Sequence, residues 1–90
     1  MQLGVEISLY PLNEEYIPHI KGFIDRLNEH SGLHVNTSHT STFVSGDYDV
    51  VMDVMNREMK KTYEQVGQAI FVCKFLNSTN MAITDAPYKS

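Results

Sequence analysis

The sequence predicts a small α+β domain with the element order β-α-β-β-α-β. Apolar and polar residues alternate over residues 2–10, two later segments carry apolar residues at spacings of three and four, and residues 69–76 are almost continuously apolar. Alternation is typical of a half-buried strand, the wider spacing of an amphipathic helix, and the short apolar segment of a strand covered on both faces. The order is that of the ferredoxin-like fold, a four-stranded antiparallel sheet with two helices on one face.

The first strand, at residues 2–10, has two chemically distinct sides. One side carries Leu3, Val5, Ile7 and Leu9, and the other carries Gln2, Gly4, Glu6, Ser8 and Tyr10. Because side chains alternate between the two faces of a sheet, the polar row is expected to look out from the face that the helices leave open. Pro11 ends the strand, since proline cannot donate a hydrogen bond to the sheet.

A first helix is expected from about Tyr16 or Ile17. Its buried side would be formed by Ile17, Ile20, Ile24 and Leu27, which recur at helical spacing. Gly32 stands where a C-terminal cap in the left-handed conformation is expected.

The middle of the chain predicts a hairpin followed by a second helix. Apolar and polar residues alternate over residues 33–38, and a hydroxyl-rich strand is expected from about Ser41 to Ser45. Asp47 can cap the helix that follows, and Gly67 can terminate it. The buried side of this helix would consist of Val51, Val54, Met55, Met59 and Thr62.

A chain of 90 residues provides one domain. We expect residues 1–76 to form it and residues 77–90 to form a C-terminal tail, in which residues 81–84 could add a short edge strand or an arm onto a partner. Both rows of the last strand are apolar, so the open face of the sheet is expected to be covered by another subunit. The partner that the sequence predicts is therefore a further copy of the chain.

The composition disfavours several classes of protein. Seven basic and eleven acidic residues give a net charge of −4 without a basic stripe, which disfavours nucleic acid as a partner. The N-terminus lacks a basic segment ahead of an apolar one, and no stretch approaches the roughly 18 apolar residues of a membrane helix. We expect a cytoplasmic protein with no membrane insertion.

The candidate ligand-binding residues lie in two segments. Glu6, Ser8 and Tyr10 form the outward row of the first strand, and Thr42, Ser45 and Asp47 belong to the segment that leads into the second helix. A shielded carboxylate could accept from a ligand amine, the phenol could stack on a ring or cation, and the hydroxyls could donate or accept. The alternatives are a solvated or interface-paired Glu6, a Tyr10 that closes the strand end, and an Asp47 that only caps the helix.

Catalytic and metal-binding patterns were not found in the sequence. No nucleophile motif, phosphate-binding glycine loop or dinucleotide fingerprint is present, so we expect a protein that is not an enzyme and that uses no cofactor. The four histidines lack helical metal-ligand spacing, and no metal site is expected, although His34 and His39 could meet across the hairpin. Cys73 is the only cysteine and is expected to be buried and inert.

Two segments resemble the YkoF-like thiamine/hydroxymethylpyrimidine-binding family. They are Glu6-Ile7-Ser8-Leu9-Tyr10-Pro11-Leu12 and the run from Thr42 to Gly46-Asp47, and the resemblance extends over about residues 3 to 76. It implies a ferredoxin-like fold, association through sheets into a homodimer or homotetramer, and binding of thiamine or its pyrimidine precursor without turnover. In this sequence Glu6, Ser8, Tyr10 and Thr42 would then contact the ligand.

Two main hypotheses for function remain open at this stage. The first is a thiamine- or pyrimidine-binding module that serves vitamin uptake, buffering or sensing. The second is a small assembly or regulatory protein whose open sheet face is a subunit interface. A cofactor-independent enzyme is the third and least supported alternative.

Overall fold

The computed structural model describes residues 1–78 of the chain. Its elements are, in order, β1 (Gln2–Pro11), α1 (Tyr16–Asn28), β2 (Leu33–Thr37), β3 (Thr42–Asp47), α2 (Tyr48–Val66) and β4 (Ala69–Leu76). The predicted order β-α-β-β-α-β is therefore confirmed. The edge strand or arm predicted at residues 81–84 lies outside the described residues, and the proposed boundary between domain and tail stays a prediction.

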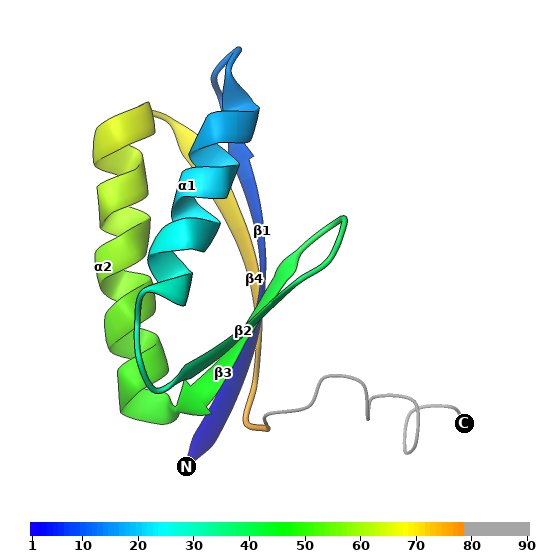
Figure 1. Ribbon diagram of the computed structural model, residues 1–90, viewed down its shortest axis with the longest axis vertical. Helices are drawn as coiled ribbons and strands as arrows, with labels where there is room; N and C mark the ends of the chain where they lie inside the picture. The colour runs from blue at the N-terminus through cyan, green and yellow to red at the C-terminus, as the bar shows by residue number, and fades with distance from the viewer. Residues whose placement is uncertain (79–90) are drawn as a thin grey trace.

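The four strands form one antiparallel sheet in the order β2-β3-β1-β4. Both helices lie on the same face of the sheet, as Figure 1 shows. This is the ferredoxin-like arrangement that the sequence predicts. Among residues 1–78, no helix has the length and apolar character needed to cross a membrane.

The strand register determines which side chains face the helices. Val5 pairs with Val44 on β3 and with Phe75 on β4, so these residues point to the helix face. Glu6 pairs with Phe43 and with Lys74, and these point to the open face.

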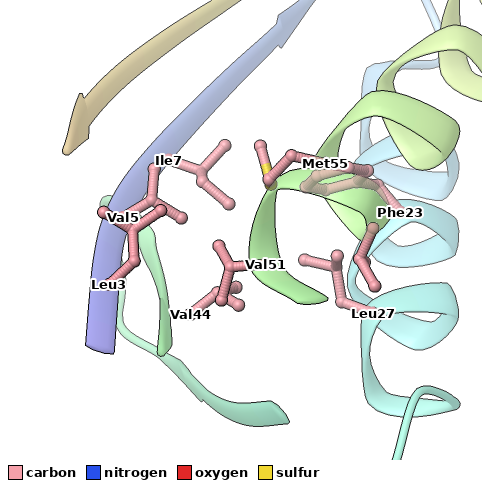
Figure 2. Packing of buried hydrophobic residues seen from close by; sticks show 9 residues of the cluster. Leu3, Val5, Ile7, Phe23, Leu27, Val44, Val51 and Met55 are labelled. Atoms are coloured by element: carbon pink, nitrogen blue, oxygen red, sulfur yellow. The ribbon is translucent and has the colours of Figure 1, made fainter. Parts of the chain in front are cut away.

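The core lies between the sheet and the two helices. Figure 2 shows Leu3, Val5 and Ile7 of β1 pointing toward Val51 and Met55 of α2 and toward Phe23 and Leu27 of α1. The fully buried apolar side chains come from both the helices and the sheet, and Phe23 and Leu27 are the largest of them. Burial of such side chains contributes about 1.5–3 kcal/mol each, which makes this contact the main source of stability for the domain.

The helix ends are partly as predicted. The carboxylate of Asp47 accepts from the backbone N–H of Asp49 at 3.2 Å, and Gly67 adopts a φ of 87° while its N–H donates to the Tyr63 carbonyl, so both predicted ends of α2 are confirmed. Gly32 also has a positive φ, of 84°, but it lies in the turn before β2 because α1 already ends at Asn28. Ile17 is 64% exposed, and its assignment to the buried side of α1 was wrong.

A glycine is required on the open face of β1. A Cβ atom on Gly4 would lie 2.7 Å from the ring of Phe43 and 2.5 Å from the carbonyl oxygen of Ser78. The absence of a side chain therefore allows the Phe43 ring of β3 to pack across β1 on the face away from the helices.

Candidate ligand-binding site

The structure separates the six predicted site residues between the two faces of the sheet. Glu6, Ser8 and Tyr10 belong to the open-face row of β1, and Ser45 and Asp47 belong to the open-face row of β3. Thr42 pairs with Ile7, so its side chain points to the helix face, where it is 5% exposed. The sequence carries a signal for this separation, because Thr42 is two positions from the buried Val44 and must share its face.

A small cavity is lined by both of the segments that contain candidate residues. Its volume is about 110 Å³, it is partly open to solvent, and residues 7–9 of β1 form one wall. Ile20, Phe23 and Ile24 of α1 form the opposite wall, and residues 37–42, at the turn of the hairpin, close it. Ser8 and Thr42 therefore both line the cavity, although Ser8 belongs to the open-face row of β1 and Thr42 to the helix-face row of β3. Wider hollows of about 480–510 Å³ elsewhere on the described surface are more open.

The turn at residues 38–41 is held by its own hydroxyls and by β1. The Ser38 N–H donates to the Ser41 carbonyl at 2.8 Å, and the Ser38 hydroxyl accepts from the N–H groups of Thr40 and Ser41. Two longer bonds tie the turn to β1: the Ser8 hydroxyl donates to the Thr40 carbonyl at 3.4 Å, and the Ser41 hydroxyl donates to Glu6 at 3.3 Å. Glu6 and Ser8 therefore position the segment that closes the cavity.

Glu6 itself is not in the lining of the cavity. Its carboxylate accepts from Ser41 and lies 3.7 Å from the Lys74 ammonium, which is 74% exposed. An exposed ion pair of this kind contributes at most about 1 kcal/mol. The sequence left open that Glu6 is only solvated or paired with another charge, and Lys74 is such a charge.

The other three candidates lie away from the cavity. Tyr10 is 54% exposed near the end of β1 and pairs with Ile70 of β4. Ser45 is buried beside Gly4 on the open face, and Asp47 caps α2. The alternative assignment of Asp47 as a helix cap is confirmed, while ligand binding by these residues stays a prediction.

Sequence reasoning missed a buried polar network between the helices. The Glu58 side chain of α2 is 5% exposed and accepts from Arg26 Nε at 2.7 Å and from His30 Nε2 at 2.8 Å. Arg26 also donates to the Thr62 hydroxyl at 2.7 Å and to Gln65 at 3.1 Å. The Arg26 side chain of α1 therefore faces α2.

The surroundings of Glu58 determine its charge. Burial alone raises the pKa of this carboxyl, but hydrogen bonds from His30 and Arg26 and the positive charges of Lys61 and Arg26 outweigh burial, so the pKa lies below its ordinary value. Glu58 is therefore ionised at neutral pH. The network joins α1 to α2 and so fixes the helix that forms one wall of the cavity.

The histidines and the cysteine that the sequence singled out do not form a common site. His34 lies on the open face of β2 opposite Ser45, whereas His39 is in the cavity lining, so the two do not meet across the hairpin. In the part of the chain that the structure describes, no group of three or more His, Cys, Asp or Glu side chains could hold a metal ion. Cys73 is half-buried, and burial raises the pKa of its thiol, which keeps it protonated at neutral pH.

The fold and this geometry define a class: a small ferredoxin-like domain with one open sheet face and a hydroxyl-lined cavity at the hairpin turn. The chain belongs to the YkoF-related family, whose family model matches residues 2–80. The resemblance seen in the sequence is thereby confirmed. No curated protein matches this chain.

Solved structures from bacteria and an archaeon share the fold. A Streptococcus pneumoniae protein has a TM-score of 0.81 at 15% identity, with 92% of this chain and 93% of that chain covered. A Thermotoga maritima protein, provisionally named a thiamine biosynthesis/salvage protein, has a TM-score of 0.74 at 16% identity and covers 83% and 82%. A hypothetical protein from Methanocaldococcus jannascii has a TM-score of 0.75 at 17% identity and covers 93% and 92%.

Proposed function

We propose that this chain is a non-catalytic binding protein for thiamine or its pyrimidine precursor, and that it serves vitamin uptake, buffering or sensing. Membership of the YkoF-related family and the thiamine-related name of one structural neighbour support this ligand class. The observation that carries the proposal is the cavity at the hairpin turn, which combines apolar walls with several hydroxyls. Ligand sites are typically apolar with a few placed polar groups.

The cavity suggests separate roles for the candidate residues. The Thr42 hydroxyl, 3.4 Å from that of Thr37, provides hydrogen bonds inside the cavity. Ser8, together with Glu6 acting through Ser41, holds the turn that closes it. The Ser8, Ser38 and Ser41 hydroxyls bond to the turn backbone or to Glu6, an arrangement that supports binding rather than nucleophilic chemistry.

Calorimetric titration of the full chain with thiamine and with hydroxymethylpyrimidine tests the proposal. Thr42→Val keeps the shape of the side chain and removes one hydroxyl, so affinity should fall about fivefold to tenfold, the effect of one hydrogen bond. Tyr10→Ala tests the alternative site on the open face: because Tyr10 is exposed and outside the lining, a ligand held in the cavity should bind this variant as it binds the wild type.

Three results would contradict parts of this proposal. Wild-type titrations without heat, confirmed by an equilibrium method, would refute the ligand class. Loss of binding in Tyr10→Ala with none in Thr42→Val would indicate the open face in place of the cavity. A ligand recovered chemically altered after incubation, as judged by mass spectrometry, would refute the non-catalytic assignment.

A second function, assembly through the open sheet face, is favoured by one specific observation. Ile70 and Val72 of β4 are each 49% exposed on that face, and Tyr10 beside them is 54% exposed. Adjacent exposed apolar side chains are typical of an interaction surface. We propose that a second copy of the chain covers this row, giving a homodimer or homotetramer.

A further inference from the structure

Exposed apolar side chains gather at the end of the domain where α1 begins and α2 ends, at the top of Figure 1. A shallow hollow of about 510 Å³ lies there between the loop after β1, the end of α2 and the start of β4. Leu12, Tyr63 and Ile70 are among its lining residues, and each is between 41% and 57% exposed. Large apolar side chains that adjoin one another on a surface are typical of an interaction site.

The first turn of α1 adds to the apolar character of this end. Tyr16 and Ile17 stand in that turn, and both are more than half exposed. The core does not use them, because the side chains that α1 buries are Phe23 and Leu27, further along the helix. Their exposure is therefore not explained by the packing of the domain alone.

The hollow is held in place by contacts on both sides. The Tyr63 ring meets that of Phe71 edge-on with centroids 5.4 Å apart, and Phe71 meets the core residue Phe23 in the same way at 5.3 Å. The Leu12 N–H donates to the Gln68 carbonyl at 3.1 Å, which ties the loop after β1 to the loop between α2 and β4. A surface fixed in this way loses little conformational entropy on binding, and tyrosine is enriched among the residues that dominate interface energies.

The charges at this end are of one sign. Among Asp, Glu, Lys and Arg, residues 11–20 and 62–73 contain only Glu14, Glu15 and Glu64. All three are exposed, and within residues 1–78 none of them takes part in an ion pair. Lysine or arginine on a partner would be attracted here, whereas the phosphates of nucleic acid or of anionic lipid would be repelled.

We propose that this end of the domain binds another protein through a segment in which large apolar side chains are flanked by lysine or arginine. The apolar side chains would occupy the hollow between Leu12 and Tyr63, and the basic ones would face Glu14, Glu15 and Glu64. A small molecule is disfavoured, because ligand sites enclose most of the ligand and this hollow is open. The proposal goes beyond the proposed function, since it involves neither the cavity at the hairpin turn nor its ligand.

Selection from a random library of displayed linear peptides, with the full chain as bait, tests the proposal. The selected peptides should be enriched in large apolar residues and in Lys and Arg, and depleted in Asp and Glu. Leu12→Gln should weaken binding of the most enriched peptide about fivefold, as measured by fluorescence anisotropy, because a half-exposed leucine loses its apolar contact. Met52→Gln is the matched control, since it changes an exposed apolar residue on the outer side of α2 and should leave binding unchanged.

The charges are tested by a second pair of variants. Glu14→Gln/Glu15→Gln should weaken peptide binding about threefold to tenfold at low salt, and the effect should shrink as salt screens the exposed charges. Asp25→Asn/Asp53→Asn removes the same charge from exposed positions on the two helices and should leave binding unchanged.

Several outcomes overturn the proposal. They are a selection that enriches no peptide able to bind the wild type, enriched peptides that lack Lys and Arg, and binding that is insensitive to Leu12→Gln. Equal weakening by either control variant also overturns it. Ile70 belongs to the row assigned to self-association as well, so sedimentation of Leu12→Gln is decisive for the occupant: a mass below that of the wild type assigns the hollow to a second copy and overturns the proposal.

Discussion

At the scale of single residues, the environment of Glu58 determines how the stability of the protein depends on pH. Its carboxylate is enclosed between α1 and α2 and accepts hydrogen bonds from both Arg26 and His30. An ionised carboxylate can only accept, so Nε2 of His30 is the donor in this contact. Removal of one partner from a buried ion pair leaves the other charge without compensation, which is far more costly than loss of a surface pair.

Glu58→Gln should lower the free energy of unfolding at pH 7 by about 3 kcal/mol, the low end of the range for breaking a buried pair. Because the pKa of Glu58 is depressed in the folded state, its contribution to stability is fully present above the ordinary glutamate pKa of about 4.3 and is lost as pH falls below it. Urea unfolding from pH 7 down to acid should therefore show the difference between wild type and variant shrinking below about pH 4.

Glu64→Gln is the matched control for this prediction. Glu64 is an exposed carboxylate on the same helix, so its substitution should change stability by less than about 0.5 kcal/mol. Equal stability losses in the two variants, or a Glu58→Gln deficit that persists unchanged in acid, would contradict the role assigned to the network.

The burial of Glu58 could have been predicted from its position. It follows Val51 by seven residues and Met55 by three, so helical periodicity places it on the buried side of α2. A charged residue at such a position requires a partner, and the sequence offers Arg26 on α1 and His30 just after the end of α1. What the sequence does not specify is how closely the two helices approach, because that distance depends on the packing of the whole core.

At the scale of elements, the strands and helices follow from local patterns. The last strand was predicted at residues 69–76 and is observed at Ala69–Leu76, since its apolar run and the preceding Gly67 are both local signals. Residue 17 was misassigned because periodicity alone does not show that α1 begins beyond the edge of the core. The cavity could not be predicted, because it forms where the turn at residues 38–41 meets β1 and α1, and these contacts are not local in sequence.

The two hydrogen bonds between β1 and this turn indicate that Ser8 and Ser41 position the turn. A Ser8→Ala/Ser41→Ala variant removes the bonds to Thr40 and to Glu6, which are long and together contribute about 1 kcal/mol. Ligand affinity should then fall about fivefold, and amide hydrogen exchange of Thr40 and Ser41 should accelerate. The thermal midpoint should fall by at most about 4–8 °C, the shift that about 1 kcal/mol produces in a domain of this size.

Ser31→Ala is the control for the turn variant, because it removes an exposed serine hydroxyl from the turn between α1 and β2. It should leave both affinity and the exchange of residues 38–41 unchanged. If the double variant binds ligand as tightly as the wild type while exchange at the turn accelerates, the turn does not contribute to the site.

At the scale of the whole molecule, the register of the sheet has the largest consequence for the site. The outward row of β1 was predicted from strict alternation, and the register confirms that Glu6, Ser8 and Tyr10 share the open face. Thr42 shares the face of Val44 by the same local alternation, whereas the position that brings it opposite Ile7 depends on the non-local pairing of β1 with β3. A shift of one residue in that pairing would reverse every side chain of β3.

The open face carries the last prediction, which concerns association. Burial of the exposed halves of Ile70 and Val72 would contribute on the order of 1 kcal/mol each per subunit, and a domain this small gains stability from such contacts. Sedimentation of the wild type should give a multiple of the 10.3 kDa chain mass, whereas Val72→Lys should shift the chain to the monomer because it places a charge beside the exposed apolar side chains of β4.

Met52→Lys is the control for this prediction. It adds the same charge on the outer side of α2, where Met52 is 38% exposed, and should leave the mass of the assembly unchanged. A wild-type chain that sediments at 10.3 kDa at every concentration would contradict self-association, and a Val72→Lys variant that stays oligomeric would place the contact elsewhere on the surface.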